Sequence, residues 1–267
     1  MKADDLKIIV KEKYGEIAKQ SNQKSSLCCG TSSGCLDTDY TMIGEKYVNL
    51  KGYYPDADLN LGCGIPTEYA NIKSGDTVID LGSGAGNDCF VARALAGDTG
   101  RIIGVDMTEL MVEKARANSD KLGFRNVEFR LGDIENLPVS ANEADVVISN
   151  CVLNLVPDKE KAFREIYRVL KPGGHLSVSD VVLRGSLHKK IQEAAKMFTG
   201  CVSGAMDIDL YLKIMNESGL INIKVQKEKL ISVPDETLLN YLNQNELSVF
   251  RESGNGIYSI TVYAEKS

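Results

Sequence analysis

The 267-residue sequence lacks several features of membrane and nucleic-acid-binding proteins. No uninterrupted apolar run approaches the roughly 18 residues that a spanning helix needs. Residues 1–20 contain acids among the first positions and lack the apolar run of a signal peptide. The formal net charge of −6 argues against a nucleic-acid surface, which requires a basic face or stripe. We therefore expect a soluble cytoplasmic protein that binds neither a membrane nor nucleic acid.

Histidine is also scarce, with only His175 and His188 in the chain. Neither has a nucleophile nearby in sequence, so we expect no Ser–His or Cys–His catalysis. Cysteine, in contrast, occurs seven times. An odd number of cysteines in a reducing compartment argues against a structural disulfide framework. These thiols are therefore either buried filler or part of the chemistry.

Strand and helix patterns alternate from Thr77 onward. Strands are predicted at 77–82, 101–106, 127–133, 144–150 and 175–183, and helices at 87–97, 108–123 and 159–174. Such alternation predicts βαβ units, a parallel sheet and right-handed crossovers. Outside this region we expect helices at 3–20, 186–206 and 209–219, closing strands at 221–231 and 257–266, and a mobile arm at 21–38. The fold class is therefore α/β.

The segment "DLGSGAG", Asp80 to Gly86, follows the first predicted strand and precedes a helix. Glycines at 82, 84 and 86 allow a tight turn and a close approach of the backbone to a ligand. The spacing is G-x-G-x-G and differs from the dinucleotide fingerprint G-x-G-x-x-G, which weakens an NAD interpretation. The loop therefore predicts a ligand pocket of another kind.

Polar side chains end the next three predicted strands. Asp106 ends the second strand, where a carboxylate can accept both hydroxyls of a ribose; a helix N-cap or a solvated turn acid is the alternative. Asp133 and Ile134 follow the third strand and suit the edge and face of an adenine, and Asn150 ends the fourth. These ends share one edge of a parallel sheet, where open α/β folds bind ligands.

The stretches "VIDLGSGAG", "GVDM", "LGDIENLP", "DVVISN" and "RVLKPGG" together resemble the class I S-adenosylmethionine methyltransferases. The resemblance implies a Rossmann-like, seven-stranded, mostly parallel sheet with helices on both faces and a reversed last hairpin. It implies that the Gly82–Gly86 loop faces the methionyl group, Asp106 the ribose, Met107 and Ile134 the adenine, and Asp133 its amine. The expected cofactor-binding set is Asp80, Gly82, Ser83, Gly84, Gly86, Asp106, Met107, Asp133, Ile134 and Asn150.

Three cysteines far apart in sequence have a setting that suggests chemistry. Cys151 directly follows the fourth strand, which should neighbour the first, so its sulfur is expected at the mouth of the cofactor crevice. Cys63 in "LGCGIP" and Cys201 in "FTGCVSGA" each follow a glycine. Their spacing is not the paired pattern of structural zinc sites. Three thiolates suit a soft three-coordinate ion, and trivalent arsenic held this way keeps a lone pair that can attack a sulfonium methyl.

The stretches "DLGSGAGNDCFVA", "GVDMT", "SNCVLNLVPDK", "RVLKPGGHLSVSDV" and "GCVSGA" resemble the arsenite methyltransferases over about residues 25–267. The resemblance implies that Cys63, Cys151 and Cys201 bind arsenic. It also implies accessory thiols, for which Cys28, Cys29 and Cys35 lie in the matching region, and a thiol reductant, thioredoxin or glutathione. The segment "LNLGCG" departs from the tyrosine-rich version of animal members and is similar to the microbial form.

Two alternatives remain at this point: a methyltransferase for a small organic acceptor, and a thiol-based protein that binds arsenic or zinc. In the first, the three sulfurs should be scattered, since a lone cysteine is usually a small buried hydrophobe. We assign that filler role to Cys89 and expect a monomer. The predicted division is 1–59, an N-terminal helix and cysteine-containing arm; 60–183, the S-adenosylmethionine-binding core; and 184–267, a C-terminal substrate-binding part with closing strands.

Overall fold

The computed structural model describes residues 3–23, 45–185, 204–240 and 242–267. The strands in these ranges are β1 (Thr77–Leu81), β2 (Arg101–Asp106), β3 (Val127–Leu131), β4 (Ala144–Asn150), β5 (Leu170–Arg184), β6 (Leu220–Leu230) and β7 (Gly256–Lys266). The α-helices are α1 (Ala3–Gln23), α2 (Asn87–Ala96), α3 (Glu109–Leu122), α4 (Lys159–Val169), α6 (Ile208–Glu217), α7 (Asp235–Leu238) and α8 (Gln244–Glu252).

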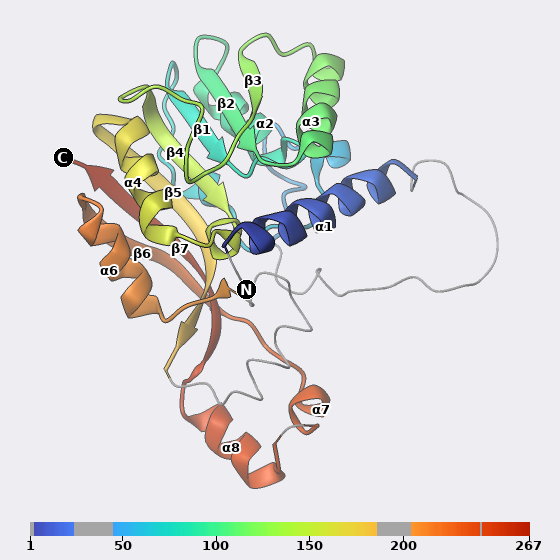
Figure 1. Cartoon of the computed structure of the whole chain (residues 1–267), viewed down its shortest axis with the longest axis vertical. Helices are drawn as coiled ribbons and strands as arrows, with labels where there is room; N and C mark the ends of the chain where they lie inside the picture. The colour runs from blue at the N-terminus through green and yellow to red at the C-terminus, as the bar shows by residue number, and fades with distance from the viewer. Residues whose placement is uncertain (1–2, 24–44, 186–203, 241) are drawn as a thin grey trace.

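The seven strands form one sheet in the order β3-β2-β1-β4-β5-β7-β6 (Figure 1). The pairs among β1 to β5 are parallel. Strand β7 runs antiparallel to both β5 and β6. The predicted α/β Rossmann-like fold with a reversed last hairpin is therefore confirmed, and β4 lies beside β1 as expected.

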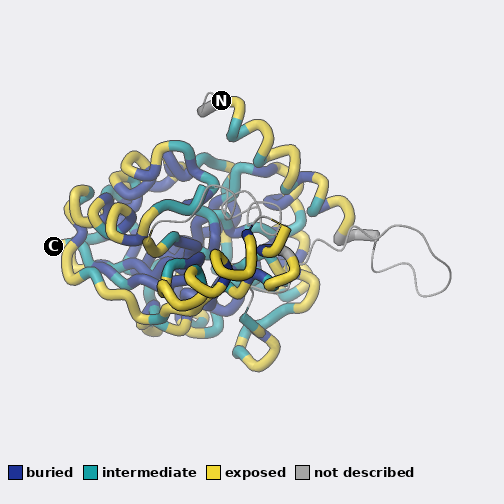
Figure 2. Tube along the Cα trace, turned by 90° about the horizontal axis from the view of Figure 1, so that it is seen from below, coloured by how far each residue is buried: buried dark blue, intermediate teal, exposed yellow. Residues whose placement is uncertain are grey.

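Apolar side chains alternate along the central strands and fill a core on each face of the sheet. Val78 and Val146 pack into the cluster that includes side chains of α2 and α3. Their neighbours Ile79 and Val147 point the other way, into the cluster that includes side chains of α4 and α6. This is the period of two that a strand imposes, and it explains why these strands are apolar throughout. Figure 2 shows the buried residues gathered inside the molecule.

Several predicted boundaries differ from the structure. The helix predicted at 159–174 ends at Val169, and Leu170 already pairs with Ala144 of β4. Strand β5 therefore begins before the Pro-Gly-Gly that was expected to end the helix. Helices α7 and α8, in the connection from β6 to β7, were not predicted. The helix expected at 186–206 and the arm expected at 21–38 lie largely outside the described residues.

Helix α1 confirms the helix predicted at 3–20, and it packs against α3 rather than standing apart (Figure 1). Among the described residues, no helix is both long and apolar enough to cross a bilayer. The division into segments 1–59, 60–183 and 184–267 stays a prediction.

Candidate active site

A pocket opens at the carboxyl ends of β1, β2 and β4, where the sequence predicted a ligand site. The glycine loop after β1, Asp106 at the end of β2 and Asn150 at the end of β4 all line it. Lys7 and Tyr14 of α1 line it as well. The N-terminal helix therefore forms one wall of the pocket.

The glycine loop has a backbone that other residues adopt at a cost. Gly82 has a φ of 68°, and a Cβ there would lie 2.4 Å from the side chain of Val152. Gly84, with a φ of 51°, has no atom within 4 Å of the place of a Cβ. The first glycine therefore allows close packing beneath the loop. The second leaves its upper surface open to a ligand.

Two buried polar atoms in the pocket wall have unused hydrogen-bonding capacity. Ser83 Oγ and Asn87 Oδ1 are buried, and neither finds a hydrogen-bond partner among the residues that the structure describes. Both residues line the pocket. A buried polar group without a partner costs free energy, so a polar ligand that reaches these atoms would be bound more tightly. S-adenosylmethionine, with its amino acid and ribose groups, fits this requirement.

Asp106 is positioned by backbone donors. Its Oδ2 accepts a hydrogen bond from the Gly84 N–H at 3.0 Å, and its Oδ1 accepts from the Thr108 N–H at 2.8 Å. Burial raises the pKa of this carboxyl, and the same N–H groups oppose the rise.

At the base of the loop, burial raises the pKa of Asp80, whose Oδ2 accepts from Cys89 Sγ. Cys89 is fully buried in the core, as predicted for a filler residue.

Asp133 takes part in an ion pair that the sequence did not predict. Lys7 Nζ lies 2.6 Å from Asp133 Oδ2 and 2.7 Å from Glu135 Oε2. Asp133 and the neighbouring Ile134 line the pocket. The residue expected to bind the adenine amine therefore also ties helix α1 to the sheet edge.

Cys151 lines the pocket and has strained backbone geometry. Its φ of 61° lies in the left-handed region, which non-glycine residues adopt at a cost on the order of 1 kcal/mol. Its N–H donates to Ser179 O at 2.7 Å, which ties the residue to β5. Strain of this kind often marks a functional position. Here it turns the chain sharply at the end of β4.

Asn150 joins the Cys151 turn to the segment that carries Cys63. Its Oδ1 accepts from the Cys63 N–H at 3.0 Å. Its Nδ2 lies 2.9 Å from Gly64 O, 2.7 Å from Tyr47 Oη and 3.1 Å from Asp88 Oδ2. Asn150 lines the pocket, but its amide hydrogen-bonds the Cys63 segment. Burial raises the pKa of Asp88 to about 6, although the hydrogen bonds from Asn150 and Tyr47 lower it.

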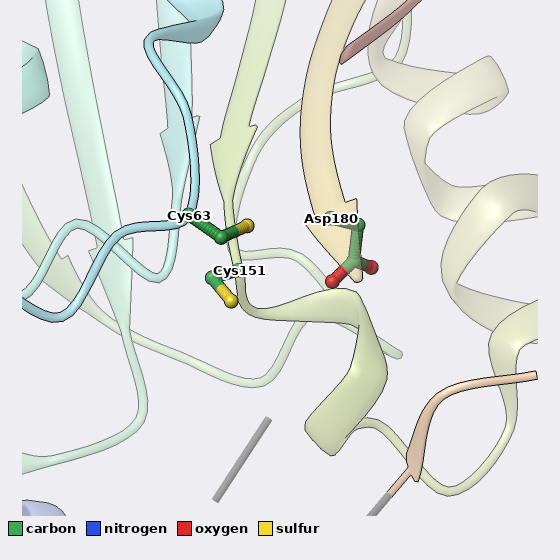
Figure 3. A group of neighbouring side chains, drawn as sticks. All are labelled: Cys63, Cys151 and Asp180. Carbon is green, nitrogen blue, oxygen red and sulfur yellow. The ribbon is translucent and has the colours of Figure 1, made fainter. Parts of the chain in front are cut away.

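Cys63, Cys151 and Asp180 form a compact buried group (Figure 3). Their two sulfurs and a carboxylate oxygen all lie within 4.8 Å of one another, and the residues are 1%, 3% and 0% exposed. Apolar side chains from β5, β7 and the β6–β7 connection pack around the thiols. Burial raises the pKa of Asp180 to about 7, while a hydrogen bond from the Val181 N–H to Asp180 Oδ1 and the charge of Lys159 oppose the rise.

The structure thus brings together two of the three thiols that the sequence singled out. The third, Cys201, and the accessory candidates Cys28, Cys29 and Cys35 lie outside the described residues. Asp180, Lys7 and Asp88 were not predicted. The available signal for Asp180 was an acid within the apolar pattern "HLSVSDVVL", because a charged residue in a strand buried on both faces needs a partner.

With this sheet order and pocket, the fold is that of the class I S-adenosylmethionine-dependent methyltransferases, and residues 72–219 match the methyltransferase domain family. An arsenite methyltransferase of Halobacterium salinarum is 37% identical over 98% of this chain and 67% of its own length. One from Mus musculus is 35% identical over 76% of this chain and 55% of its own. The chain belongs to the arsenite methyltransferase family.

A solved structure gives the same result. The arsenic(III) S-adenosylmethionine methyltransferase of Chlamydomonas reinhardtii superposes with a TM-score of 0.64 and 33% identity. That likeness covers 77% of this chain and 67% of the other. The chain thus spans about two thirds of the archaeal and algal proteins and about half of the mouse protein.

Proposed function

We propose that this protein transfers methyl groups from S-adenosylmethionine to thiol-bound trivalent arsenic, as an arsenic detoxification enzyme. The observation that carries the proposal is the convergence of Cys63 and Cys151 beside the cofactor pocket. Methyl transfer to an organic acceptor does not require two buried thiols at that edge. Binding of arsenic requires them, since trivalent arsenic is a soft ion that prefers thiolate ligands.

The cofactor, when bound, supplies an electrophilic methyl group. We assign its binding to the glycine loop, Ser83, Asp106, Met107, Asp133 and Ile134, with Asp80 supporting the loop from below. Gly84 leaves the loop surface open, and Asp106 is held by backbone N–H groups with its remaining lone pairs available for hydroxyls. Helix α1 forms one wall of this pocket. Asn150 contributes by fixing the Cys63 segment beside the pocket.

We assign Cys63 and Cys151 to the arsenical, with Cys201 as the third thiol. Each thiol displaces one hydroxyl group of the arsenical, so an arsenic–sulfur bond forms, an arsenic–oxygen bond breaks and water leaves with the thiol proton. The arsenic lone pair then needs no general base. The contribution of the protein is alignment, which requires reacting atoms about 3–3.5 Å apart.

Methyl transfer to the lone pair would break the sulfonium–methyl bond, release S-adenosylhomocysteine and leave pentavalent arsenic. Two thiols that are oxidised to a disulfide supply the two electrons that return it to the trivalent state. We propose thioredoxin or glutathione as the source, with Cys28, Cys29 and Cys35 as accessory thiols. We also propose a cytoplasmic location, because this reduction needs a reducing compartment. The proposed oligomeric state is a monomer.

The test measures transfer of a tritiated methyl group to arsenite by the full chain, with Cys151→Ser as the informative variant. Cys89→Ser is the matched control, because Cys89 is equally buried and a serine hydroxyl can still donate to Asp80. We expect Cys151→Ser to lose at least about 100-fold in rate, the size of effect expected when a reacting group is no longer held in place, while binding S-adenosylmethionine normally. Methylation of arsenite that is equal in the two variants would refute the assignment.

A further inference from the structure

The Cys63–Cys151–Asp180 group contains one ligand that trivalent arsenic does not need. Its two sulfurs and one carboxylate oxygen come from three separate segments: the loop before β1, the turn after β4 and strand β5 (Figure 3). Zinc binds sulfur at about 2.3 Å and carboxylate oxygen at about 2.0–2.2 Å, so tetrahedral ligands are separated by roughly 3.5–3.8 Å. The three atoms lie within 4.8 Å of one another, so closure on a cation needs shifts of about 1 Å.

The charges around the group also suit a dication. Two thiolates balance a charge of +2 in full. The carboxylate of Asp180 accepts hydrogen bonds from the Val181 N–H at 2.9 Å and from the Tyr211 hydroxyl at 3.3 Å. Because an uncompensated buried charge is costly, a dication that is balanced by the two thiolates enters without adding net charge to the interior.

We propose that Cys63, Cys151 and Asp180 form a binding site for a thiophilic divalent cation, zinc or cadmium. Binding replaces two S–H bonds with two metal–sulfur bonds and releases two protons. Three protein ligands leave a fourth position for water or a small thiol, as in zinc sites that are not purely structural. Resting on the proposed function, the same occupancy excludes trivalent arsenic and inhibits methylation.

Asp180 distinguishes binding of the divalent cation from binding of trivalent arsenic. Carboxylate oxygen is an ordinary zinc ligand, whereas trivalent arsenic takes its bonds from sulfur. Asp180→Asn keeps the size of the side chain and removes the anionic ligand. It should therefore weaken the cation far more than the arsenical.

The experiment uses the full chain, unaltered and with Cys28, Cys29, Cys35 and Cys201 replaced by serine, which leaves Cys63, Cys89 and Cys151. Cadmium is titrated and followed by cadmium–thiolate absorbance, without S-adenosylmethionine. The ¹¹³Cd NMR shift then reports whether oxygen shares the ligand shell with sulfur. Arsenite retained after gel filtration is measured on the same samples, and Cys89→Ser serves as the matched thiol control.

We expect one cadmium ion per serine-substituted chain, bound by both sulfur and oxygen. The affinity for cadmium should be at least about tenfold weaker in Asp180→Asn, which is the scale of losses at metal sites. Arsenite retention should change less than about threefold in that variant. Cadmium affinity unchanged by Asp180→Asn or by Cys63→Ser, or a shell without oxygen, overturns the proposal. If Asp180→Asn does not fold, the NMR shift of the parent decides alone. Absence of methyl transfer would count against the proposed function and leave the cadmium result intact.

Discussion

Asn150→Ala tests how the two cysteine segments are held together. The substitution removes the acceptor of the Cys63 N–H and a donor to Gly64 O, bonds of 3.0 and 2.9 Å. The amide packs closely against Gly62, because a Cβ on Gly62 would lie 2.5 Å from Asn150 Nδ2, so the substitution leaves a gap at that contact. Each buried group left without a partner costs about 1–3 kcal/mol. Two such groups sum to about 2–6 kcal/mol, and because both bonds are only part-buried we expect the Cys63 segment to loosen by about 2–4 kcal/mol.

The substitution should lower the affinity for arsenite, because chelation of arsenic needs both the Cys63 and the Cys151 sulfur in place. If about 1.4–2.8 kcal/mol of that loss appears in binding, the affinity for arsenite falls about 10- to 100-fold. The assay compares binding of phenylarsine oxide, which needs two thiols, with the rate at which a monofunctional reagent labels Cys151. The first should weaken, and the second should stay unchanged. A global loss of stability would instead raise the labelling rate, because Cys151 is only 3% exposed in the folded protein.

Asn154→Ala is the matched control, because Asn154 is a buried asparagine four residues further on. Its Nδ2 donates to Val181 O at 2.7 Å, and within the part of the chain that the structure describes it makes no hydrogen bond to the Cys63 segment. The reasoning is refuted if Asn150→Ala binds phenylarsine oxide within about twofold of Asn154→Ala, a difference well under the 1.4 kcal/mol of a tenfold change.

Three further predictions follow from the pocket. Lys7→Ala should weaken S-adenosylmethionine binding about 2- to 10-fold, measured by calorimetry. The reason is that a half-buried ion pair worth about 0.5–1.4 kcal/mol holds α1 against the pocket. Tighter binding would show that Lys7 competes with the cofactor for Asp133. Gly82→Ala should abolish cofactor binding through its clash with Val152, and a normal dissociation constant would contradict this. The raised pKa of Asp88, about 6, means that the folded protein holds this proton more tightly than the unfolded chain does. The unfolding free energy should therefore fall by about 2 kcal/mol from pH 4 to pH 6, out of about 3 kcal/mol for the whole shift, and urea titrations of Asp88→Asn should lack that part of the slope.

The sheet and the position of Cys151 could be predicted because both depend on local patterns. Strand β4 reads as an apolar run, and parallel topology then fixes its end beside β1, so Cys151 had to lie at the crevice. The place of Cys63 was available only through resemblance. Its segment has no regular period, and its path depends on the Asn150 amide, a contact between residues 87 positions apart.

The remaining site residues depend on tertiary contacts that have no sequence period. Lys7 lies among the charged residues of an amphipathic helix, where a solvated face is the ordinary interpretation. Only the docking of α1 brings it to Asp133 and Glu135. Helices α7 and α8 were missed because the connection from β6 to β7 is short of strong periodic signals, yet Leu238 and Leu247 of these helices pack in the cluster around the thiols.

X-ray absorption at the arsenic edge tests most directly whether the two sulfurs act as one binding site. The full chain is loaded with one equivalent of arsenite, and the number of sulfur neighbours is counted before and after Cys151→Ser and Cys63→Ser. We expect three sulfurs in the parent, from Cys63, Cys151 and Cys201, and two in each variant. A shell made of oxygen, or a sulfur count that neither substitution changes, would contradict the account.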